Sequence, residues 1–130
     1  MRLLLDTHIA LWSIIDDPKL SKSARDLLSD PETQPFISTV SIWEIGIKHR
    51  LARRSSDIPV SAPQALEWLE RAGFTLLPVS GAHAIAAETT ALSVADPFDR
   101  MLLAQAIAEG MPLVTHDARL AAHGEGVIRV

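Results

Sequence analysis

The apolar run Leu3–Leu5 is followed directly by Asp6, and this junction is the strongest constraint on how the 130-residue chain can fold. A strand with no alternation of apolar and polar residues is typical of a parallel sheet with helices on both faces. Ligands of such sheets bind beyond the carboxyl ends of the strands. Asp6 is therefore predicted to reach a ligand-binding edge, although an Asp at this place could instead cap the helix that follows.

The composition indicates one globular domain over residues 1–130, because 48% of the residues are hydrophobic and the length suits a single core. The sequence contains no Cys, which excludes disulfides, zinc-thiolate sites and thiol catalysis. Nothing at the start resembles a signal peptide, and no apolar run approaches the about 18 residues of a membrane span. We expect a cytoplasmic protein that does not bind membranes.

Segments with strand-like and helix-like patterns alternate along the chain. We expect strands near 3–5, 36–38, 74–79, 112–115 and 127–130, and helices near 7–15, 21–28, 40–54, 61–72, 82–92 and 100–109. No hairpin signal such as Asn-Gly occurs, so right-handed crossovers and a mainly parallel sheet are predicted. The fold class is therefore α/β.

Acidic residues mark the same edge of the predicted sheet at two further strands. Asp117 follows an apolar strand, as Asp6 does, and Glu44 follows the strand at 36–38. Glu44 has a second interpretation, since Ser41 to Glu44 fits a capping box at the start of a helix. From spacing alone, the capping role of Glu44 is favoured over a role in a site.

Asp96 and Asp99 begin the helix near 100–109, with Pro97 between them. This order also has an ordinary explanation, because Asp caps helices, Pro suits the first helical position and acids in the first turn suit the helix dipole. The helix itself is almost entirely apolar, so it must be buried. Its acidic start is thereby fixed against the core.

Several carboxylates at one edge repel each other unless a cation lies among them. Oxygen ligands without Cys favour Mg²⁺, or Mn²⁺, over zinc. One or two such ions can activate water and stabilise the leaving oxygen of a phosphodiester. The predicted reaction is metal-dependent hydrolysis of a nucleic-acid backbone. Thr7 and Thr115, next to two of the acids, could orient carboxylates or water, whereas His8 and His116 are more typical of structural or supporting positions.

Positive charge is concentrated in one segment of an acidic chain. Of the net charge of −4, a contribution of +4 falls within seven residues, so the rest carries −8. Such a face is usually just solvated, but beside an acidic metal site it could neutralise RNA phosphates. The residues assigned to RNA binding are Lys48, Arg50, Arg53 and Arg54.

Four motifs, in their order and spacing, resemble those of the PIN-domain ribonucleases, specifically the VapC-type toxins. They are Leu-Leu-Leu-Asp6-Thr7-His8, Ser41-Ile-Trp-Glu44, Asp96-Pro-Phe-Asp99-Arg-Met-Leu-Leu-Ala-Gln-Ala and Leu-Val-Thr115-His-Asp117. The resemblance implies a three-layer α/β/α sandwich and a Mg²⁺-dependent endoribonuclease. It also implies inhibition by a cognate antitoxin in the active-site groove, a homodimer and a toxin–antitoxin hetero-oligomer.

Carried over by position, the resemblance assigns Asp6, Glu44, Asp99 and Asp117 to catalysis and metal binding, and it leaves Asp96 as a cap or supporting partner. The choice of Asp99 over Asp96 rests on the position directly before the Ala-rich helix. A catalytically silent PIN-like module that binds RNA or protein is the alternative function. An aspartyl phosphatase is disfavoured because His8 stands where a second Asp would be needed.

Overall fold

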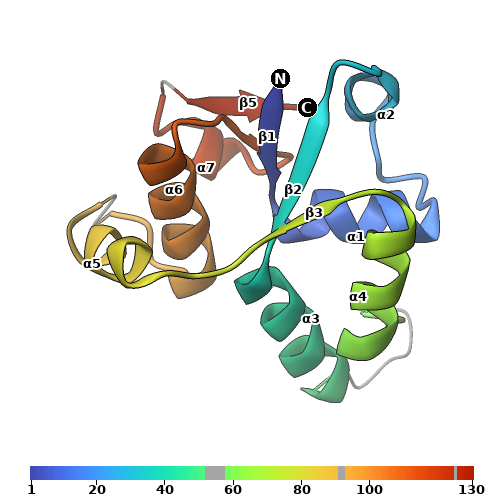
Figure 1. The fold of residues 1–130 in the computed structure, drawn as a ribbon, viewed down its shortest axis with the longest axis horizontal. Coiled ribbons are helices and arrows are strands. Elements are labelled where there is room, and N and C mark those ends of the chain that lie inside the picture. The colour runs from blue at the N-terminus through green and yellow to red at the C-terminus, as the bar shows by residue number, and fades with distance from the viewer. Residues whose placement is uncertain (52–57, 91–92, 125) are drawn as a thin grey trace.

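The computed structural model describes residues 1–51, 58–90, 93–124 and 126–130 (Figure 1). In this part of the chain, no helix is long and apolar enough to cross a membrane. The strands are β1 (Arg2–Leu5), β2 (Gln34–Ser38), β3 (Thr75–Leu77), β4 (Leu113–Thr115) and β5 (Val127–Arg129). The helices are α1 (Thr7–Ile15), α2 (Lys22–Ser29), α3 (Thr39–Leu51), α4 (Ala62–Arg71), α5 (Gly81–Thr89), α6 (Pro97–Glu109) and α7 (Ala118–Ala121).

The strands form one parallel sheet in the order β3-β2-β1-β4-β5. The chain leaves the central strand β1 toward β2 and β3, and then crosses back to β4 and β5 on the other side. The chain therefore turns toward one side of the sheet after β1 and toward the other side after β4. The point between the carboxyl ends of these two strands is the topological switch point, where open α/β sheets bind ligands. The residues that follow β1 and β4 are placed in this crevice.

The core lies on both faces of the sheet, and the side chains of β1 divide between them. Leu3 and Leu5 pack with residues of α1, α2, α3 and α4, whereas Leu4 packs with residues of α6 and α7. All three leucines are fully buried, which explains why the strand shows no alternation of polarity. The predicted three-layer α/β/α architecture is confirmed (Figure 1).

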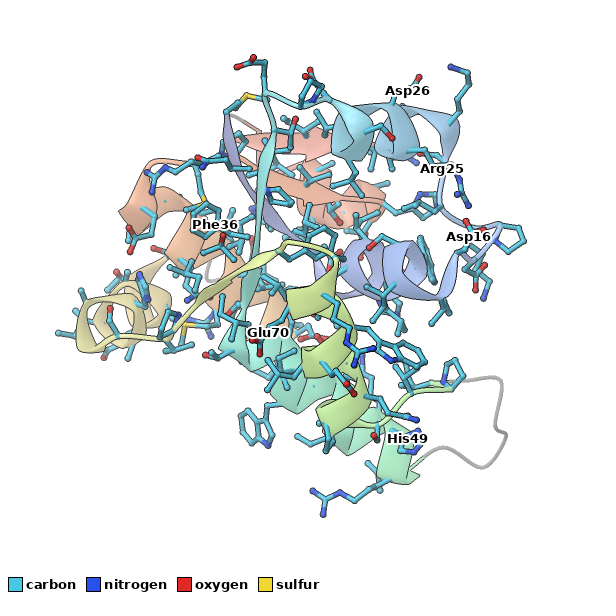
Figure 2. The ribbon with its side chains drawn as sticks, turned by 45° about the vertical axis from the view of Figure 1, so that its right-hand side comes forward. Asp16, Arg25, Asp26, Phe36, His49 and Glu70 are labelled. Atoms are coloured by element: carbon cyan, nitrogen blue, oxygen red, sulfur yellow. The ribbon has the colours of Figure 1, made fainter. Side chains whose placement is uncertain are left out.

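Polar contacts at serine residues fix the start of several helices. Ser21 caps α2, Ser80 caps α5, and Ser61 forms a capping box with Gln64 at α4. Beyond the end of α1, the guanidinium group of Arg25 donates to the Asp16 carboxylate at 2.5 Å, which ties this corner to α2 (Figure 2). The order of helices and strands predicted from the sequence matches that of the structure closely.

The predicted capping box at Ser41 and Glu44 is wrong. Helix α3 begins at Thr39, and the Ser38 hydroxyl accepts the hydrogen bond from the Val40 amide at 3.1 Å. Because the helix begins earlier, Ser41 and Glu44 lie inside it and are buried. Leu51, an apolar residue at the end of α3, is 74% exposed.

Candidate active site

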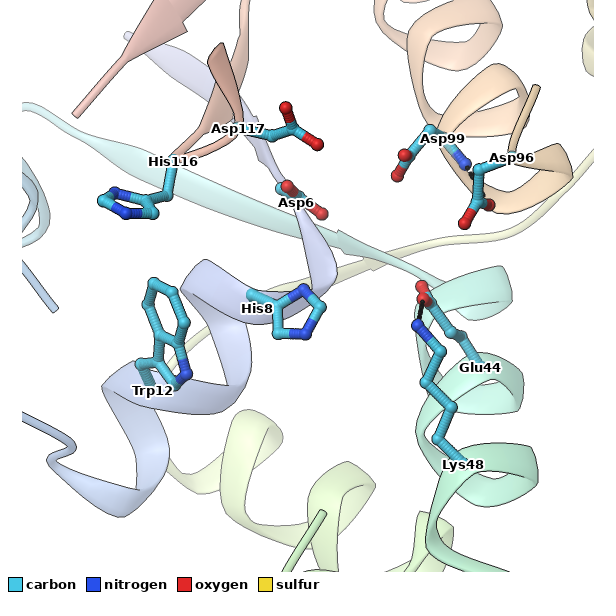
Figure 3. A pocket seen from close by; sticks show the side chains of 9 residues that line it. All are labelled: Asp6, His8, Trp12, Glu44, Lys48, Asp96, Asp99, His116 and Asp117. Carbon is cyan, nitrogen blue, oxygen red and sulfur yellow. Dashed lines mark hydrogen bonds and ion pairs between the residues drawn. The ribbon is translucent and has the colours of Figure 1, made fainter. Parts of the chain in front are cut away.

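A cavity of about 380 Å³ opens at the carboxyl edge of β1 and β4 (Figure 3). Five carboxylates from four segments of the chain line it, and they include all four residues predicted to bind a metal. The carboxylates belong to Asp6, Glu44, Asp96, Asp99 and Asp117. The switch point of the sheet is thus an acidic pocket.

Asp6 is held at the base of this cavity by the register of the sheet. Leu5 pairs with Val114, so the next residues of the two strands, Asp6 and Thr115, lie side by side. The Thr115 hydroxyl donates to Asp6 Oδ2 at 2.7 Å, and Asp6 is 7% exposed. Asp6 precedes α1, yet its side chain makes no capping hydrogen bond. The capping interpretation of Asp6 is therefore wrong.

Glu44 reaches the cavity from the first half of α3 and is 3% exposed. The Thr7 hydroxyl donates to Glu44 Oε1 at 2.6 Å, and the Lys48 ammonium group forms an ion pair with Glu44 Oε2 at 2.6 Å. The hydroxyls of Thr7 and Ser41 are also within hydrogen-bond distance, at 2.8 Å. Both carboxylate oxygens of Glu44 are thus held in place by specific partners.

The remaining carboxylates come from helix starts. Asp96 caps α6 and accepts hydrogen bonds from the amides of Phe98 and Asp99 at 2.8 and 3.2 Å. Asp117 caps α7, accepting from the Arg119 amide through Oδ1 at 2.7 Å. Asp99 lies in the first turn of α6, half-buried, and among the described residues no group donates a hydrogen bond to its side chain. Its carboxylate is therefore free to take a ligand.

Burial and mutual repulsion alter the acidity of this pocket. Burial, together with the charges of Asp6, Asp96, Glu44 and Asp117, raises the pKa of Asp99 to about 7. Burial also raises the pKa of Asp6, although the hydrogen bond from Thr115 opposes the rise. These shifts mean that the pocket holds more negative charge than it can stabilise alone.

Among the described residues that line the cavity, Lys48 is the basic side chain that lies beside these acids. Burial acts to lower the pKa of the Lys48 amine, but the hydrogen bond and charge of Glu44, with the charges of Asp96 and Asp99, raise it above its ordinary value. Lys48 was predicted to lie on an outward basic face, so its place in the cavity is a difference from the expectation. Arg50 is exposed, and Arg53 and Arg54 lie outside the described residues.

The five carboxylates of the cavity fit a hard divalent cation, because Mg²⁺ and Mn²⁺ prefer oxygen ligands. The imidazoles of His8 and His116 also line the cavity, and the sequence has no Cys. As the side chains stand, no three His, Asp or Glu residues within the described ranges are close enough together to hold one ion. The carboxylates stand apart as like charges do, and their repulsion, in addition to burial, raises the pKa of Asp99. A bound cation would relieve that repulsion, with Asp6, Asp99, Glu44 and Asp117 as the available ligands.

Sequence reasoning did not identify the aromatic lining of the cavity. Trp12 of α1 borders the pocket together with His8, one helical turn before it, and His116, which follows β4. The spacing of four residues between His8 and Trp12 places both on one helix face and was the available signal. The proximity of His116 depends on the sheet topology and has no local signature.

A family model and a curated relative both match this chain over most of its length. The model of the PIN domain family matches residues 3–126. The chain is 31% identical to "Ribonuclease VapC22" of Mycobacterium tuberculosis over 123 residues, which is 92% of this chain and 90% of that protein. These are the proteins that the four sequence motifs resemble.

Several solved structures share the fold of this chain. VapBC2 of Rickettsia felis, bound to a DNA fragment from its promoter, matches with a TM-score of 0.67 and 16% identity, over 100% of this chain and 98% of that chain. A toxin–antitoxin complex of Klebsiella pneumoniae matches with a TM-score of 0.64 and 20% identity, over 97% and 95%. VapBC-1 of nontypeable Haemophilus influenzae gives 0.63 and 15%, over 94% and 91%.

Proposed function

The chain belongs to the PIN domain family, and from this premise we propose that it is the toxin of a toxin–antitoxin pair and acts as a metal-dependent endoribonuclease. The observation that carries the proposal is the cavity at the switch point of the sheet, where carboxylates from four segments face one space. The 31% identity to a protein named as a ribonuclease supports RNA as the substrate.

We assign the metal site to Asp6, Glu44, Asp99 and Asp117, with Mg²⁺ as the expected ion and Mn²⁺ as a substitute. Asp99 supports the assignment because burial and the repulsion of the neighbouring carboxylates raise its pKa to about 7, and a cation would offset both effects. When bound, the ion supplies activation of water and stabilisation of the leaving oxygen of a phosphodiester. Asp96 is assigned a supporting role, since its side chain is engaged in capping α6.

The chain's own residues prepare the site for hydrolysis. Thr115 orients Asp6 and Thr7 orients Glu44 through hydrogen bonds of 2.7 and 2.6 Å, so two carboxylates are fixed before substrate arrives. Lys48 supplies positive charge beside the position of the scissile phosphate. In the reaction, the oxygen of water bonds to phosphorus, one bridging P–O bond breaks, and the leaving oxygen takes up a proton.

We further propose a cognate antitoxin as a partner, because the matched structures are complexes of toxins with antitoxins. An antitoxin that covers the acidic cavity would block access of RNA to all five carboxylates at once. A homodimer of the toxin within a toxin–antitoxin hetero-oligomer is the expected assembly. The purified antitoxin should form a complex with the protein, which size-exclusion chromatography would report. The same mixture should show no cleavage in an RNA cleavage assay.

The decisive experiment is cleavage of total cellular RNA by the purified protein with Mg²⁺, with Mn²⁺ and with EDTA. The variants are Asp6→Asn and Asp99→Asn. The control is Asp26→Asn on α2 (Figure 2), whose exposed side chain forms a surface ion pair with Lys22 and does not line the cavity. We expect discrete fragments with either metal, and none with EDTA or either site variant.

Cleavage that survives metal removal or Asp6→Asn would refute the metal-site assignment. RNA that is bound but left intact under every condition would instead support a silent binding module. The Asp26→Asn control should cleave as the wild type does, because its ion pair is exposed at both ends.

A further inference from the structure

Three rings form one wall of the acidic cavity, on the side away from Asp96 and Asp99 (Figure 3). The Trp12 indole lies between two imidazoles. Its ring centroid is 5.6 Å from that of His8 and 5.5 Å from that of His116, at interplanar angles of 51° and 72°. We propose that this aromatic wall, His8, Trp12 and His116, stacks a base of single-stranded RNA beside the scissile phosphate. The inference rests on the proposed ribonuclease function and specifies how the substrate is held.

Two rings of the wall are held in place before any substrate binds. The His116 ring is exposed, and its Nδ1 lies 3.1 Å from the backbone oxygen of Val130. A backbone oxygen accepts hydrogen bonds, so Nδ1 is the donor in this contact. Trp12 is partly buried and packs against the core cluster of β1 and α1. Rings held in this way lose little conformational entropy when a base stacks on them.

A second cavity continues the path past the indole. It has a volume of about 180 Å³, and His8 and Trp12 line it as well as the acidic cavity. The exposed Lys19 lies on its lining together with Asp17, whose carboxylate accepts a hydrogen bond from the Lys19 amide at 2.8 Å. A strand whose phosphate lies at the carboxylates could therefore cross the indole and reach the ammonium group of Lys19 with a neighbouring phosphate.

The charge of the pocket explains why an uncharged contact is needed. Five carboxylates against Lys48 repel an RNA backbone wherever metal does not neutralise them. Stacking on an aromatic ring is attractive regardless of this charge, and it tolerates any sequence because every base has a π face. Bases in an A-form duplex are stacked inside the helix, so the wall selects single-stranded segments.

The test measures binding in EDTA, where metal-dependent hydrolysis cannot occur. The probes are fluorescein-labelled hexauridine and the same ribose-phosphate chain without bases, followed by fluorescence anisotropy. The variants are Trp12→Leu, which keeps apolar bulk toward the core, and Trp12→Phe, which keeps a π face. The control is Trp68→Leu on α4, a partly exposed tryptophan outside the cavity.

We expect Trp12→Leu to weaken hexauridine binding by about tenfold and binding of the abasic chain by less than about twofold. Trp12→Phe should restore most of the loss, and Trp68→Leu should bind as the wild type does. In a protein with Trp43→Phe and Trp68→Phe, the emission of Trp12 should be quenched by hexauridine and not by the abasic chain. Thermal unfolding of each variant reports whether it is folded.

Equal losses for both probes, or equal losses in Trp12→Leu and Trp12→Phe, would overturn the stacking role. If the wild type cleaves RNA with Mg²⁺ while Trp12→Leu binds hexauridine normally, the inference fails and the proposed function stands. If the wild type neither cleaves RNA nor binds hexauridine, both fail.

Discussion

Asp99→Asn should stabilise the metal-free protein while it abolishes RNA cleavage. The Asp99 carboxylate is half-buried, and the charges of Asp6, Asp96, Glu44 and Asp117 all act against its ionisation. Asn has the same shape without the charge, so the variant removes this repulsion and leaves the packing of α6 unchanged. A substitution that removes a proposed metal ligand would thus make the apoprotein more resistant to unfolding.

The magnitude follows from the pKa. A rise from 3.8 to about 7 corresponds to about 4 kcal/mol, at roughly 1.4 kcal/mol per pKa unit. Because nearly half of the carboxyl is open to solvent, screening reduces this figure. We therefore expect a gain of about 2 kcal/mol in the free energy of unfolding above pH 8. For a chain of this length, that gain is a rise in Tm of roughly 8 °C.

The gain must depend on pH in a defined direction. Between about pH 4 and 7 the folded protein retains a proton on Asp99 that the unfolded chain has released, so wild-type stability falls as the pH rises through this window. Asn does not titrate. The difference in Tm between Asp99→Asn and the wild type should therefore be less than half of its full size near pH 5 and reach its full size at pH 8.

Thermal unfolding by circular dichroism at pH 5 and pH 8, in EDTA and in excess Mg²⁺, measures all of these effects. Mg²⁺ should raise the Tm of the wild type more than that of Asp99→Asn, because binding to the folded state stabilises it. The control Asp26→Asn removes an exposed carboxylate and should change Tm little at either pH. An equal gain at both pH values, or no gain at pH 8, would refute the repulsion argument.

Three further substitutions test separate parts of the site. Thr115→Val removes the donor to Asp6, and we expect a 10- to 100-fold weaker response to Mg²⁺ in a cleavage titration; an unchanged titration would contradict the orienting role. Lys48→Met leaves the buried Glu44 without its cation, so the Tm in EDTA should fall and Mg²⁺ should recover most of the loss; a Tm equal to that of the wild type would argue against the ion pair. Arg50→Ser should lower the slope of log Kd for RNA against log salt by about one, and an unaltered slope would remove Arg50 from the RNA-binding face.

The sheet was predictable because its signal lies within single strands. Leu3–Leu5 read as a strand buried on both faces, and the structure divides these leucines between two cores. The sharp change from apolar to acidic residues also located the carboxyl ends of β1 and β4, where Asp6 and Asp117 follow. Parallel strands bring these ends to one edge, so the acidic pocket could be anticipated without knowing the strand order.

The surroundings of Glu44 could not be read from local sequence. Two serines, Ser38 and Ser41, precede it within six residues, and either could cap α3. The choice depends on where β2 stops pairing in the sheet. Thr7, which bonds Glu44, is 37 residues away. The aromatic wall could not be predicted from local sequence either, because the pairing of β4 with β1 is what brings His116 to Trp12.

Three aspartates stand at N-cap positions in this cavity, and the hydrogen bonds of their side chains separate their roles. Asp96 accepts two backbone amides, Asp117 accepts one through Oδ1, and Asp6 accepts none. A cap contributes about 1 kcal/mol to a helix, so α1 forgoes this stabilisation while the Asp6 carboxylate stays directed into the cavity by Thr115. Because Asp6 lacks this capping role and is buried among like charges, we expect its carboxylate to serve the proposed metal site. The same comparison ranks Asp6 above Asp117, and Asp117 above Asp96, in the expected loss of cleavage on substitution by Asn.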